Sequence, residues 1–291
     1  MSAAMTRCNL CHATEFELLI HKDGCDVVRC QTCELIFVAN PPTDEERQRL
    51  YSFDAGYHTE LQTDAESNAF HQREANANLA VLRRHVKAGR LLDIGCSTGL
   101  FLQAARDIGW LGQGLEYSAD SSAIAREQHG LTVRTGELKP DTFAPASFDV
   151  VTLWDVIEHV PDPQGTLQLI TDIVAPGGLL VLKTPDAGGW FPQASLRLAR
   201  RLDFWRHAEP PGHLYQFSQR TLSAMVEKAG FEVVACHSHR IPIPYSFGPA
   251  STWVRSAKWF VYCAAFIPMT WLGPFFGRGD DMTLVCRKRA A

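Results

Sequence analysis

Short apolar runs alternate with amphipathic segments along the chain from residue 90 to its end. Apolar runs bounded by glycine and polar residues predict buried strands, and apolar residues at intervals of three and four predict helices. Strands are predicted at 91–95, 111–118, 131–137, in the first part of 148–160, and at 179–185, 231–238 and 281–288. Helices are predicted between them at 97–109, 119–130, 163–175 and 219–229.

Residues at the ends of these helices support the boundaries. Ser118 and Ser218 stand where an N-cap is expected, and Gly109 and Gly230 stand near the C-terminal ends. Pro176 and the two glycines that follow it are expected to close the helix at 163–175.

Near-continuous apolar strands that alternate with amphipathic helices are typical of a parallel sheet with both faces covered. The sequence therefore predicts an α/β fold with a Rossmann-like, doubly wound and mostly parallel sheet. Ligands of such sheets bind at the carboxyl ends of the strands, near the point where the strand order reverses. The 291 residues suffice for one large domain or two smaller ones.

The composition is that of an ordinary globular protein. Hydrophobic residues make up 46% of the chain and charged residues 21%, as in ordinary globular proteins. The net charge of -4 gives no support for a strongly basic nucleic-acid binder. The N-terminal stretch MSAAMTRCNL has no apolar signal core, so we expect a cytoplasmic protein with reduced thiols.

Two C-x-x-C pairs near the N-terminus predict a metal site. Cys8 and Cys11 form the first pair, Cys30 and Cys33 form the second, and 18 residues separate the pairs. This spacing is typical of a zinc ribbon with four thiolate ligands around a structural Zn²⁺. The alternatives are four unrelated free thiols, or Cys25 in place of Cys30 as a ligand. After this module, residues 43–88 predict one or two connecting helices.

A glycine turn follows the predicted strand at 91–95. The stretch LDIGCSTG places Gly95 and Gly99 around Ser97, which stands where a dinucleotide-binding loop has its second glycine. The strand at 111–118 carries Glu116, and a carboxylate at that offset accepts hydrogen bonds from ribose hydroxyls of either NAD or S-adenosylmethionine (SAM). A pyrophosphate needs close backbone approach at the middle position, whereas a methionine tail does not, so Ser97 favours SAM.

Four stretches in order, LLDIGCSTGLFL, GLEYS, SFDVVTLWDVIEHVPDP and APGGLLVLKTP, resemble the class I SAM-dependent methyltransferases over residues 88–240. The chain is most similar to the branch with ubiquinone-pathway and natural-product enzymes. The resemblance implies a zinc ribbon at 1–40, connecting helices at 41–88 and a SAM-binding domain at 89–291. Insertions in that domain are expected at 186–212 and 241–279.

The resemblance also implies roles for individual residues of the cofactor site. Residues around the glycine turn would hold the methionine part of SAM, the next strand would hold the ribose, and residues after the following strands would line the adenine or face the acceptor. The implied set is Asp93, Gly95, Cys96, Ser97, Gly99, Glu116, Tyr117, Glu137, Leu138 and Trp154.

Candidates for catalysis follow the strand at 148–160. The sulfonium of SAM is an activated donor, so the reaction needs chiefly an aligned acceptor. A general base helps when the acceptor is a hydroxyl or a carbon acid. His213 and His159 are candidates for this base, because histidine titrates near neutral pH, and Asp155 and Glu158 are candidates to orient a histidine. For His159 the alternative is a structural hydrogen bond.

The first insertion contains a basic amphipathic segment at 194–207, which either lies on an anionic surface or packs on the domain. The second contains an uncharged run at 259–277, whose length touches the transmembrane threshold of about 18 residues. A single crossing is not expected, because strands on both sides of the insertion would join one sheet. Pro268, Gly273 and Pro274 are also expected to break a helix of spanning length.

Two interpretations of the second insertion remain: a lid on the acceptor pocket, or a shallow contact with a membrane, which Arg255, Lys258 and Arg278 at its edges would suit. We expect a SAM-dependent enzyme that methylates a small-molecule or lipid-like acceptor in a biosynthetic pathway, with peripheral membrane contact under the second interpretation. The alternatives are a zinc-ribbon RNA methyltransferase and a non-catalytic zinc-ribbon scaffold.

Overall fold

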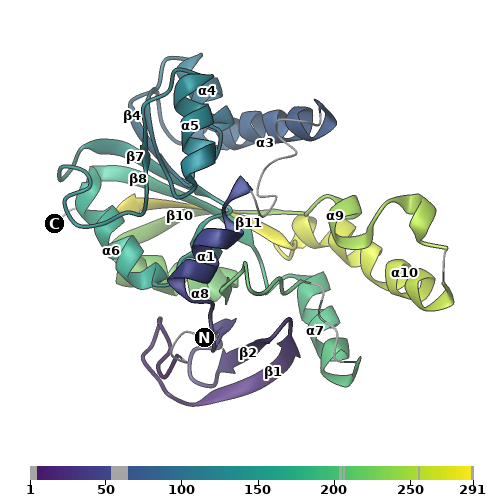
Figure 1. Cartoon of the computed structure of the whole chain (residues 1–291). Helices are drawn as coiled ribbons and strands as arrows, with labels where there is room; N and C mark the ends of the chain where they lie inside the picture. Colours follow the sequence, from purple (N-terminus) through teal and green to yellow (C-terminus); the bar gives the residue numbers. More distant parts are fainter. Residues whose placement is uncertain (1–4, 54–64, 203–204, 206, 255, 290–291) are drawn as a thin grey trace.

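A seven-stranded sheet forms the centre of the computed structural model, which describes residues 5–53, 65–202, 205, 207–254 and 256–289 (Figure 1). The strand order is β10-β11-β8-β7-β4-β5-β6. The strands are β4 (Arg90–Ile94), β5 (Leu111–Glu116), β6 (Val133–Thr135), β7 (Phe148–Trp154), β8 (Val174–Pro185), β10 (Phe231–His239) and β11 (Asp281–Lys288). Strands β8 to β6 pair in parallel, and β11 runs antiparallel to both neighbours. The predicted mostly parallel α/β fold is confirmed.

Helices cover both faces of this sheet. One face carries α3 (Ala65–Arg83), α4 (Leu100–Arg106) and α5 (Ala119–Glu127), and the other carries α6 (Pro163–Ile173) and α8 (Gln219–Lys228) (Figure 1). Leu91 and Val150 belong to the apolar cluster of the first face, and their neighbours Leu92 and Val151 belong to that of the second. Burial of both faces explains why these strands form near-continuous apolar runs.

The capping predictions are confirmed at α5 and α8, where the Ser118 and Ser218 side chains accept hydrogen bonds from backbone N–H groups of the first turn. The predicted end of α6 is wrong. The helix ends at Ile173, and the Pro-Gly-Gly turn lies within β8 as a bulge, since Phe148 pairs with Val174 but Val150 pairs with Leu179. The backbone is already extended at Val174, so the strand begins before the turn.

The N-terminal module is a small antiparallel sheet of β1 (Phe16–Lys22), β2 (Cys25–Cys30) and β3 (Ile36–Val38). Its fourth strand is β9 (Tyr215–Gln216), which comes from the segment just before α8. Leu10 and Phe37 of the module share one buried cluster with Met225 of α8. The module is therefore packed onto the larger sheet domain through a common core.

Two helices connect the module to the large sheet within the described ranges, as the pattern of residues 43–88 predicts. Helix α1 (Asp44–Leu50) begins with a capping box, in which Thr43 and Glu46 satisfy each other's backbone N–H groups. Helix α3 contributes Ala75, Leu79 and Leu82 to the cluster on the first sheet face. It is thus part of the core of the large domain as well as a connection.

Helix α7 (Trp190–Leu202) lies in the first predicted insertion and packs on the module. Its residue Leu196 shares a buried cluster with Ile20, Val27 and Trp205. This contact favours packing on the domain over an anionic surface for the segment at 194–207, of which residues 203, 204 and 206 lie outside the described residues.

Residues 241–279, called the arm below, project from the end of the sheet (Figure 1). The arm contains α9 (Ile243–Phe247), a turn of 3₁₀-helix at Ala250–Thr252, α10 (Ala257–Leu272) and a second 3₁₀ turn at Gly273–Phe276. Both ends of the arm return to one sheet edge, where His239 pairs with Asp281. This geometry confirms the reasoning against a single membrane crossing.

The expectation that Pro268 breaks the helix of the arm is wrong. Pro268 lies inside the helix, which ends only at the Gly273-Pro274 step. Within the described ranges, one helical stretch, Ala257–Phe276, is long and apolar enough to cross a membrane by length and composition alone. Arg255 lies outside the described residues.

Candidate functional site

A cavity of about 700 Å³ lies at the carboxyl ends of β4, β5 and β7. The glycine turn after β4 and the helices α1 and α3 all contribute residues to its lining. Its size falls in the range of about 300–1,000 Å³ that is usual for small-molecule sites. The strand order reverses beside β4, so this is the place at which an open α/β sheet binds its ligand.

The glycine turn requires glycine for steric reasons at two positions. Gly95 has φ of +73°, and a Cβ added there would lie 2.4 Å from Val156 Cγ2. Gly99 caps α4 with φ of +89°, and an added Cβ would lie 2.3 Å from Leu131 Cδ1. Ser97 between them also has a positive φ, of 49°, and lines the cavity. Because Gly95 has no side chain, the loop can lie close to Val156, which follows β7. Because Gly99 has none, the start of α4 can pack against Leu131.

Two buried carboxyl groups lie beneath this turn. Glu116 accepts hydrogen bonds from the backbone N–H groups of Ser97 and Ser118, each over 2.7 Å. Asp93 accepts a hydrogen bond from the Thr152 hydroxyl over 2.6 Å. Burial raises the pKa of Glu116 and raises the pKa of Asp93 to about 8. Each group therefore lies in a site that a cationic or hydroxyl-bearing ligand would stabilise in its charged form.

The end of the cavity at β5 and β6 is held by a residue of α1. Arg47 Nη2 lies 3.3 Å from Glu137 Oε1, and its guanidinium lies over the Tyr117 ring at 5.7 Å from the centroid. Tyr51 meets the same ring edge-on at 5.7 Å. Gly136 also lines this end, and no atom of the described residues lies within 4 Å of a Cβ placed on it. Gly136 therefore leaves open space at this end of the cavity.

The opposite end of the cavity contains Asp155, directly after β7. Its backbone has φ of 55°, and its Oδ2 lies 3.0 Å from the buried Lys183 Nζ. Lys183 also pairs with Glu74 of α3 at 3.3 Å and with Asp281 at 3.6 Å. Burial alone would lower the pKa of Lys183, but the three carboxylates raise it well above its usual value. One cation thus links α3, β7, β8 and β11 behind the cavity.

Two histidines lie together near Asp155. His159 lines the cavity, and its ring lies 4.7 Å from that of His213, which is not among the lining residues. Burial lowers the pKa of His159, so the ring is neutral at pH 7. Its Nδ1 lies 2.9 Å from the Gly212 carbonyl oxygen and therefore carries the proton, which leaves a lone pair on Nε2.

The structure brings most of the expected site residues together. The cavity is lined by Asp93, Gly95, Cys96, Ser97, Glu116, Tyr117, Glu137, Leu138, Trp154, Asp155 and His159. Gly99 and His213 lie next to lining residues instead. The Nε1 of Trp154 is buried and has no hydrogen-bond partner among the described residues, which suits a site for a polar ligand.

Sequence reasoning missed the contribution of the two connecting helices. They add Asp44, Arg47, Tyr51, His71, Glu74, Ala75 and Asn78 to the lining. The local pattern of these segments predicts helices and carries no chemical motif. Their place in the cavity wall depends on contacts with distant strands.

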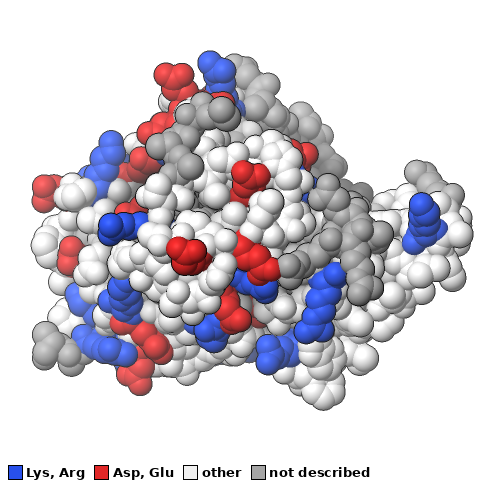
Figure 2. Space-filling model, turned by 90° about the horizontal axis from the view of Figure 1, so that it is seen from below, with Lys and Arg blue, Asp and Glu red and all other residues white. Residues whose placement is uncertain are grey.

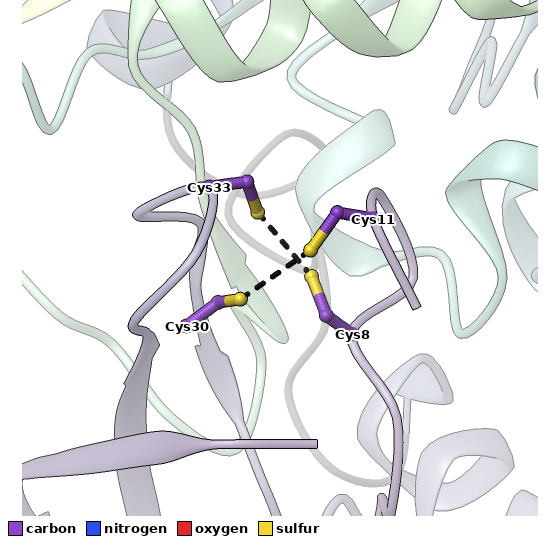
Figure 3. Close-up of side chains that lie close together, drawn as sticks. All are labelled: Cys8, Cys11, Cys30 and Cys33. Atoms are coloured by element: carbon purple, nitrogen blue, oxygen red, sulfur yellow. Dashed lines mark hydrogen bonds between the residues drawn. The ribbon is translucent and has the colours of Figure 1, made fainter. Parts of the chain in front are cut away.

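The four expected zinc ligands form a cluster in the N-terminal module (Figure 3). The sulfur atoms of Cys8, Cys11, Cys30 and Cys33 lie within 4.8 Å of one another, and two of the pairs, Cys8–Cys33 and Cys11–Cys30, are 3.5 Å apart. Four thiolates bound to one Zn²⁺ at about 2.3 Å lie about 3.8 Å apart. The donor set therefore fits a tetrahedral zinc ion.

Both C-x-x-C turns have the same backbone geometry. The N–H of His12 donates to the Cys8 carbonyl and the N–H of Glu34 donates to the Cys30 carbonyl, each over 2.9 Å. Both donor residues have φ of 63°. Paired turns of this kind are the expected architecture of a zinc ribbon. Cys25 is buried outside the cluster, which leaves Cys30 as the fourth sulfur.

Residues 67–236, more than half of the chain, match the family described as "Methyltransferase domain". A Ubiquinone biosynthesis O-methyltransferase from Paraburkholderia phymatum is 34% identical over 106 residues, 34% of this chain and 46% of that protein. The enzyme of the same name from Aeromonas salmonicida is 28% identical over 153 residues, 50% of this chain and 63% of that protein. The chain thus matches between about half and two thirds of the length of these relatives.

Solved structures agree on the fold. A SAM-dependent methyltransferase from Thermotoga maritima aligns with a TM-score of 0.53 and 20% identity, over 80% of this chain and 98% of that one. A structure of the Haloferax volcanii Trm112 methyltransferase activator in complex with a methyltransferase aligns with a TM-score of 0.56 and 20% identity, over 79% of this chain and 96% of the matched chain. Together with the sheet order and the glycine turn, these matches show that the chain belongs to the class I SAM-dependent methyltransferases.

Proposed function

We propose that the enzyme transfers the methyl group of SAM to a small-molecule or lipid-like acceptor of a biosynthetic pathway. The observation that carries this proposal is one cavity that runs from Glu116 and Tyr117 to Asp155 and His159. A concave site of about 700 Å³ suits a cofactor with a small acceptor beside it. The names of the curated relatives support a small biosynthetic acceptor that is methylated on oxygen.

The lining residues suggest a division of the cavity. Glu116 would accept hydrogen bonds from ribose hydroxyls with the lone pairs that its two backbone contacts leave free. Tyr117, Glu137 and Leu138 would surround the adenine, and Asp93 and the turn at 95–97 would hold the methionine part. Trp154 and Asp155 would lie where the cofactor meets the acceptor.

SAM supplies a methyl group that is already activated for displacement. The protein must then align the acceptor and exclude water, which is the larger part of such catalysis. A neutral His159 with a free lone pair on Nε2 would accept a proton from an acceptor hydroxyl. Asp155 is fixed by Lys183 and would orient the acceptor or the histidine ring.

Incubation of the purified protein with SAM labelled in the methyl group tests the acceptor class. Label is expected in an organic-extractable or small polar product when extracts of the source cell are divided into lipids, metabolites and total RNA. Label in the RNA fraction alone would instead support an RNA methyltransferase. If SAM failed to bind in calorimetry, the non-catalytic scaffold would be favoured.

We also propose that the arm contacts an anionic membrane surface. Its 39 residues, 241–279, contain three basic residues and no acidic residue. Large apolar side chains are exposed along it, among them Val254 at 75%, Val261 at 65% and Phe275 at 79%. Figure 2 shows the arm as the lobe on the right, which is almost free of charged side chains on that face. Patches of this kind mark contacts with membranes or partners.

The position of the arm supports a role in delivery of the acceptor. The Tyr245 ring of α9 lies 5.4 Å from that of Phe70 in α3, the helix that also lines the cavity. No residue of the arm lines the cavity among those described, so a lid over this cavity is not supported.

Flotation with vesicles of anionic lipid tests the contact between the arm and a membrane. The wild type is expected to float with the vesicles, and F275S/F276S is expected to remain at the bottom of the gradient. Equal flotation of both proteins, or of neither, would refute the proposal.

We further propose that the zinc ribbon is structural and fixes the segment at 212–217. Strand β9 lies in the ribbon sheet, and the Leu214 N–H donates to the Glu158 carbonyl at the cavity end over 2.8 Å. Asn9 of the ribbon also donates to Asp162 over 2.7 Å. The ribbon therefore supports the loop that carries His213.

A further inference from the structure

Acidic side chains outnumber basic ones in the lining of the cavity. Arg47 is the one lysine or arginine among the described residues that line it. The acidic lining residues are Asp44, Glu74, Asp93, Glu116, Glu137, Asp155 and Asp162. A concave site with this balance of charge attracts cations and repels anions.

Arg47 lies at the end of the cavity opposite Asp155, where the proposed function places the adenine. Its Nη2 lies 2.8 Å from Asp44 Oδ1 and 3.3 Å from Glu137 Oε1. Two carboxylates therefore compensate its charge. Arg47 is thus not available to an anionic group of an acceptor at the other end.

Two carboxylates line the end of the cavity at which the acceptor is expected. Glu74 reaches this end from α3, and Asp155 follows β7. The two side chains are partly exposed, and both pair with Lys183 Nζ, over 3.3 Å and 3.0 Å. Lys183 does not line the cavity and also pairs with Asp281 at 3.6 Å. Because one cation is shared among three carboxylates, this end of the cavity keeps a negative charge.

The histidines at this end do not offset that charge. Burial lowers the pKa of His159, so its ring is neutral at pH 7. His71 lines the cavity beside Glu74, and its Nδ1 lies 3.9 Å from Glu74 Oε2. A positive charge on His71 would therefore already face a carboxylate of the protein.

The N-terminus of α6, which begins beside the cavity, is also closed to an anion. Asp162 and Thr166 are lining residues there. An uncapped helix N-terminus commonly binds a carboxylate or phosphate. Here the N–H of Gly165 donates to Asp162 Oδ1 over 3.0 Å, and the N–H of Gln164 donates to Asn9 Oδ1 over 2.9 Å. Side chains of the protein therefore occupy the donors that an anionic ligand would need.

We propose that Glu74 and Asp155 restrict the acceptor to compounds that bring a neutral or cationic group, and no carboxylate, phosphate or sulfate, into this end of the cavity. The inference rests on the proposed methyl transfer, since it concerns the acceptor of that reaction. An anionic group would lose its water and meet two carboxylates without an uncommitted lysine or arginine among the described lining residues. A hydroxyl or an amine can instead donate a hydrogen bond to either carboxylate. Glu74 is thus a specificity-determining residue.

Fractionation of source-cell extract by charge tests the acceptor class whatever the shape of the acceptor. Metabolites and lipids are each passed over an anion exchanger at pH 7, and every fraction is incubated with the enzyme and SAM labelled in the methyl group. Label is expected in an unretained fraction. Label only in a retained fraction would overturn the inference and leave methyl transfer standing. No label in any fraction would refute the proposed function, and the inference with it.

Glu74→Gln tests the role of the side chain, because it removes the charge and keeps the size. The probes are p-cresol, p-hydroxybenzoate and tyramine, which share a phenol and carry a neutral, a negative and a positive substituent. They are compared by kcat/KM, or by inhibition of label transfer to the unretained fraction when a probe is not methylated. The wild type should use or bind p-hydroxybenzoate least. Its value relative to p-cresol should rise at least about tenfold in Glu74→Gln, because one repulsive charge is lost.

The matched control is Glu127→Gln, at an exposed carboxylate of α5 that does not line the cavity. The control should keep the ratio of the wild type, and thermal unfolding establishes that both variants fold. Equal values of the wild type for p-hydroxybenzoate and p-cresol would overturn the proposal. An unchanged ratio in Glu74→Gln, or an equal rise in the control, would overturn the role of Glu74.

Discussion

The backbone N–H of Ser97 donates to the carboxylate of Glu116 over 2.7 Å, which joins the glycine turn after β4 to the end of β5. The turn keeps its shape through this bond, since Ser97 adopts a positive φ that a non-glycine residue rarely takes. The buried carboxylate thus holds the loop, and under the proposed function it would also bind the ribose of the cofactor.

Glu116→Gln should weaken SAM binding by about 10- to 100-fold, as the loss of charged hydrogen bonds costs about 1.5–3 kcal/mol. The amide of glutamine would also place a donor against one of the two backbone N–H groups. Calorimetric titration with SAM measures the effect. Glu137→Gln, at a side chain that is 44% exposed, should have a smaller effect. Equal effects of both changes would contradict the assignment.

Gly95→Ala should destabilise the protein by about 1–3 kcal/mol and abolish tight SAM binding, because the new Cβ would lie 2.4 Å from Val156. Urea unfolding measures the stability. Gly130→Ala is a control that separates backbone strain from the clash. Gly130 has φ of +60° but open space around it, so this change should lower the free energy of unfolding by only about 1 kcal/mol. Partial rescue of the first change by Val156→Ala is expected, and its absence would exclude the clash as the cause.

Lys183→Met should lower the free energy of unfolding by about 3–5 kcal/mol near neutral pH, because it leaves the buried carboxylate of Asp281 without its cation. Burial already raises the pKa of Asp281, and loss of Lys183 raises it further. The unfolded chain ionises this carboxyl readily and the folded chain does not, so the variant should lose stability as pH rises from 4 to 7. Urea unfolding at several pH values tests this. Adding Asp281→Asn to Lys183→Met should make the free energy of unfolding depend less on pH.

The free energy of unfolding of the wild type should also fall as the pH is lowered from 8 to 5. Burial lowers the pKa of His207 to about 4, so between that value and about 6.5 the unfolded chain binds a proton that the folded chain does not. This histidine alone should cost about 2 kcal/mol between pH 8 and pH 5. His207→Gln should remove that part of the pH dependence. An unchanged profile for His207→Gln would refute the assignment.

Cys30→Ser should lower the zinc content and the unfolding temperature together, since the small ribbon depends on its metal to fold. Metal analysis and calorimetry measure the two quantities. Cys25→Ser is the matched control, as Cys25 is buried in the same module but lies outside the cluster. If activity disappeared in Cys30→Ser while stability and zinc content stayed normal, the ribbon would have a direct role in catalysis.

The sequence by itself determined the strands and helices of the large sheet, the cysteine pairs and the turn at 95–99. These features depend on local patterns: apolar runs for strands buried on both faces, serines that cap the first turn of a helix, and glycines at backbone angles that other residues avoid. The order of four such motifs predicted the methyltransferase fold, which the sheet order and the family match confirm.

Only the tertiary structure decided which distant segments share a site. The placement of Arg47 and Tyr51 in the cavity wall, of β9 in the ribbon sheet and of His213 beside Glu158 joins parts of the chain that are far apart in sequence. No local pattern encodes these contacts, because they arise from the packing of apolar faces onto one common core. Packing also leaves the arm exposed, and its length and hydropathy alone could not separate a buried helix from a projecting one.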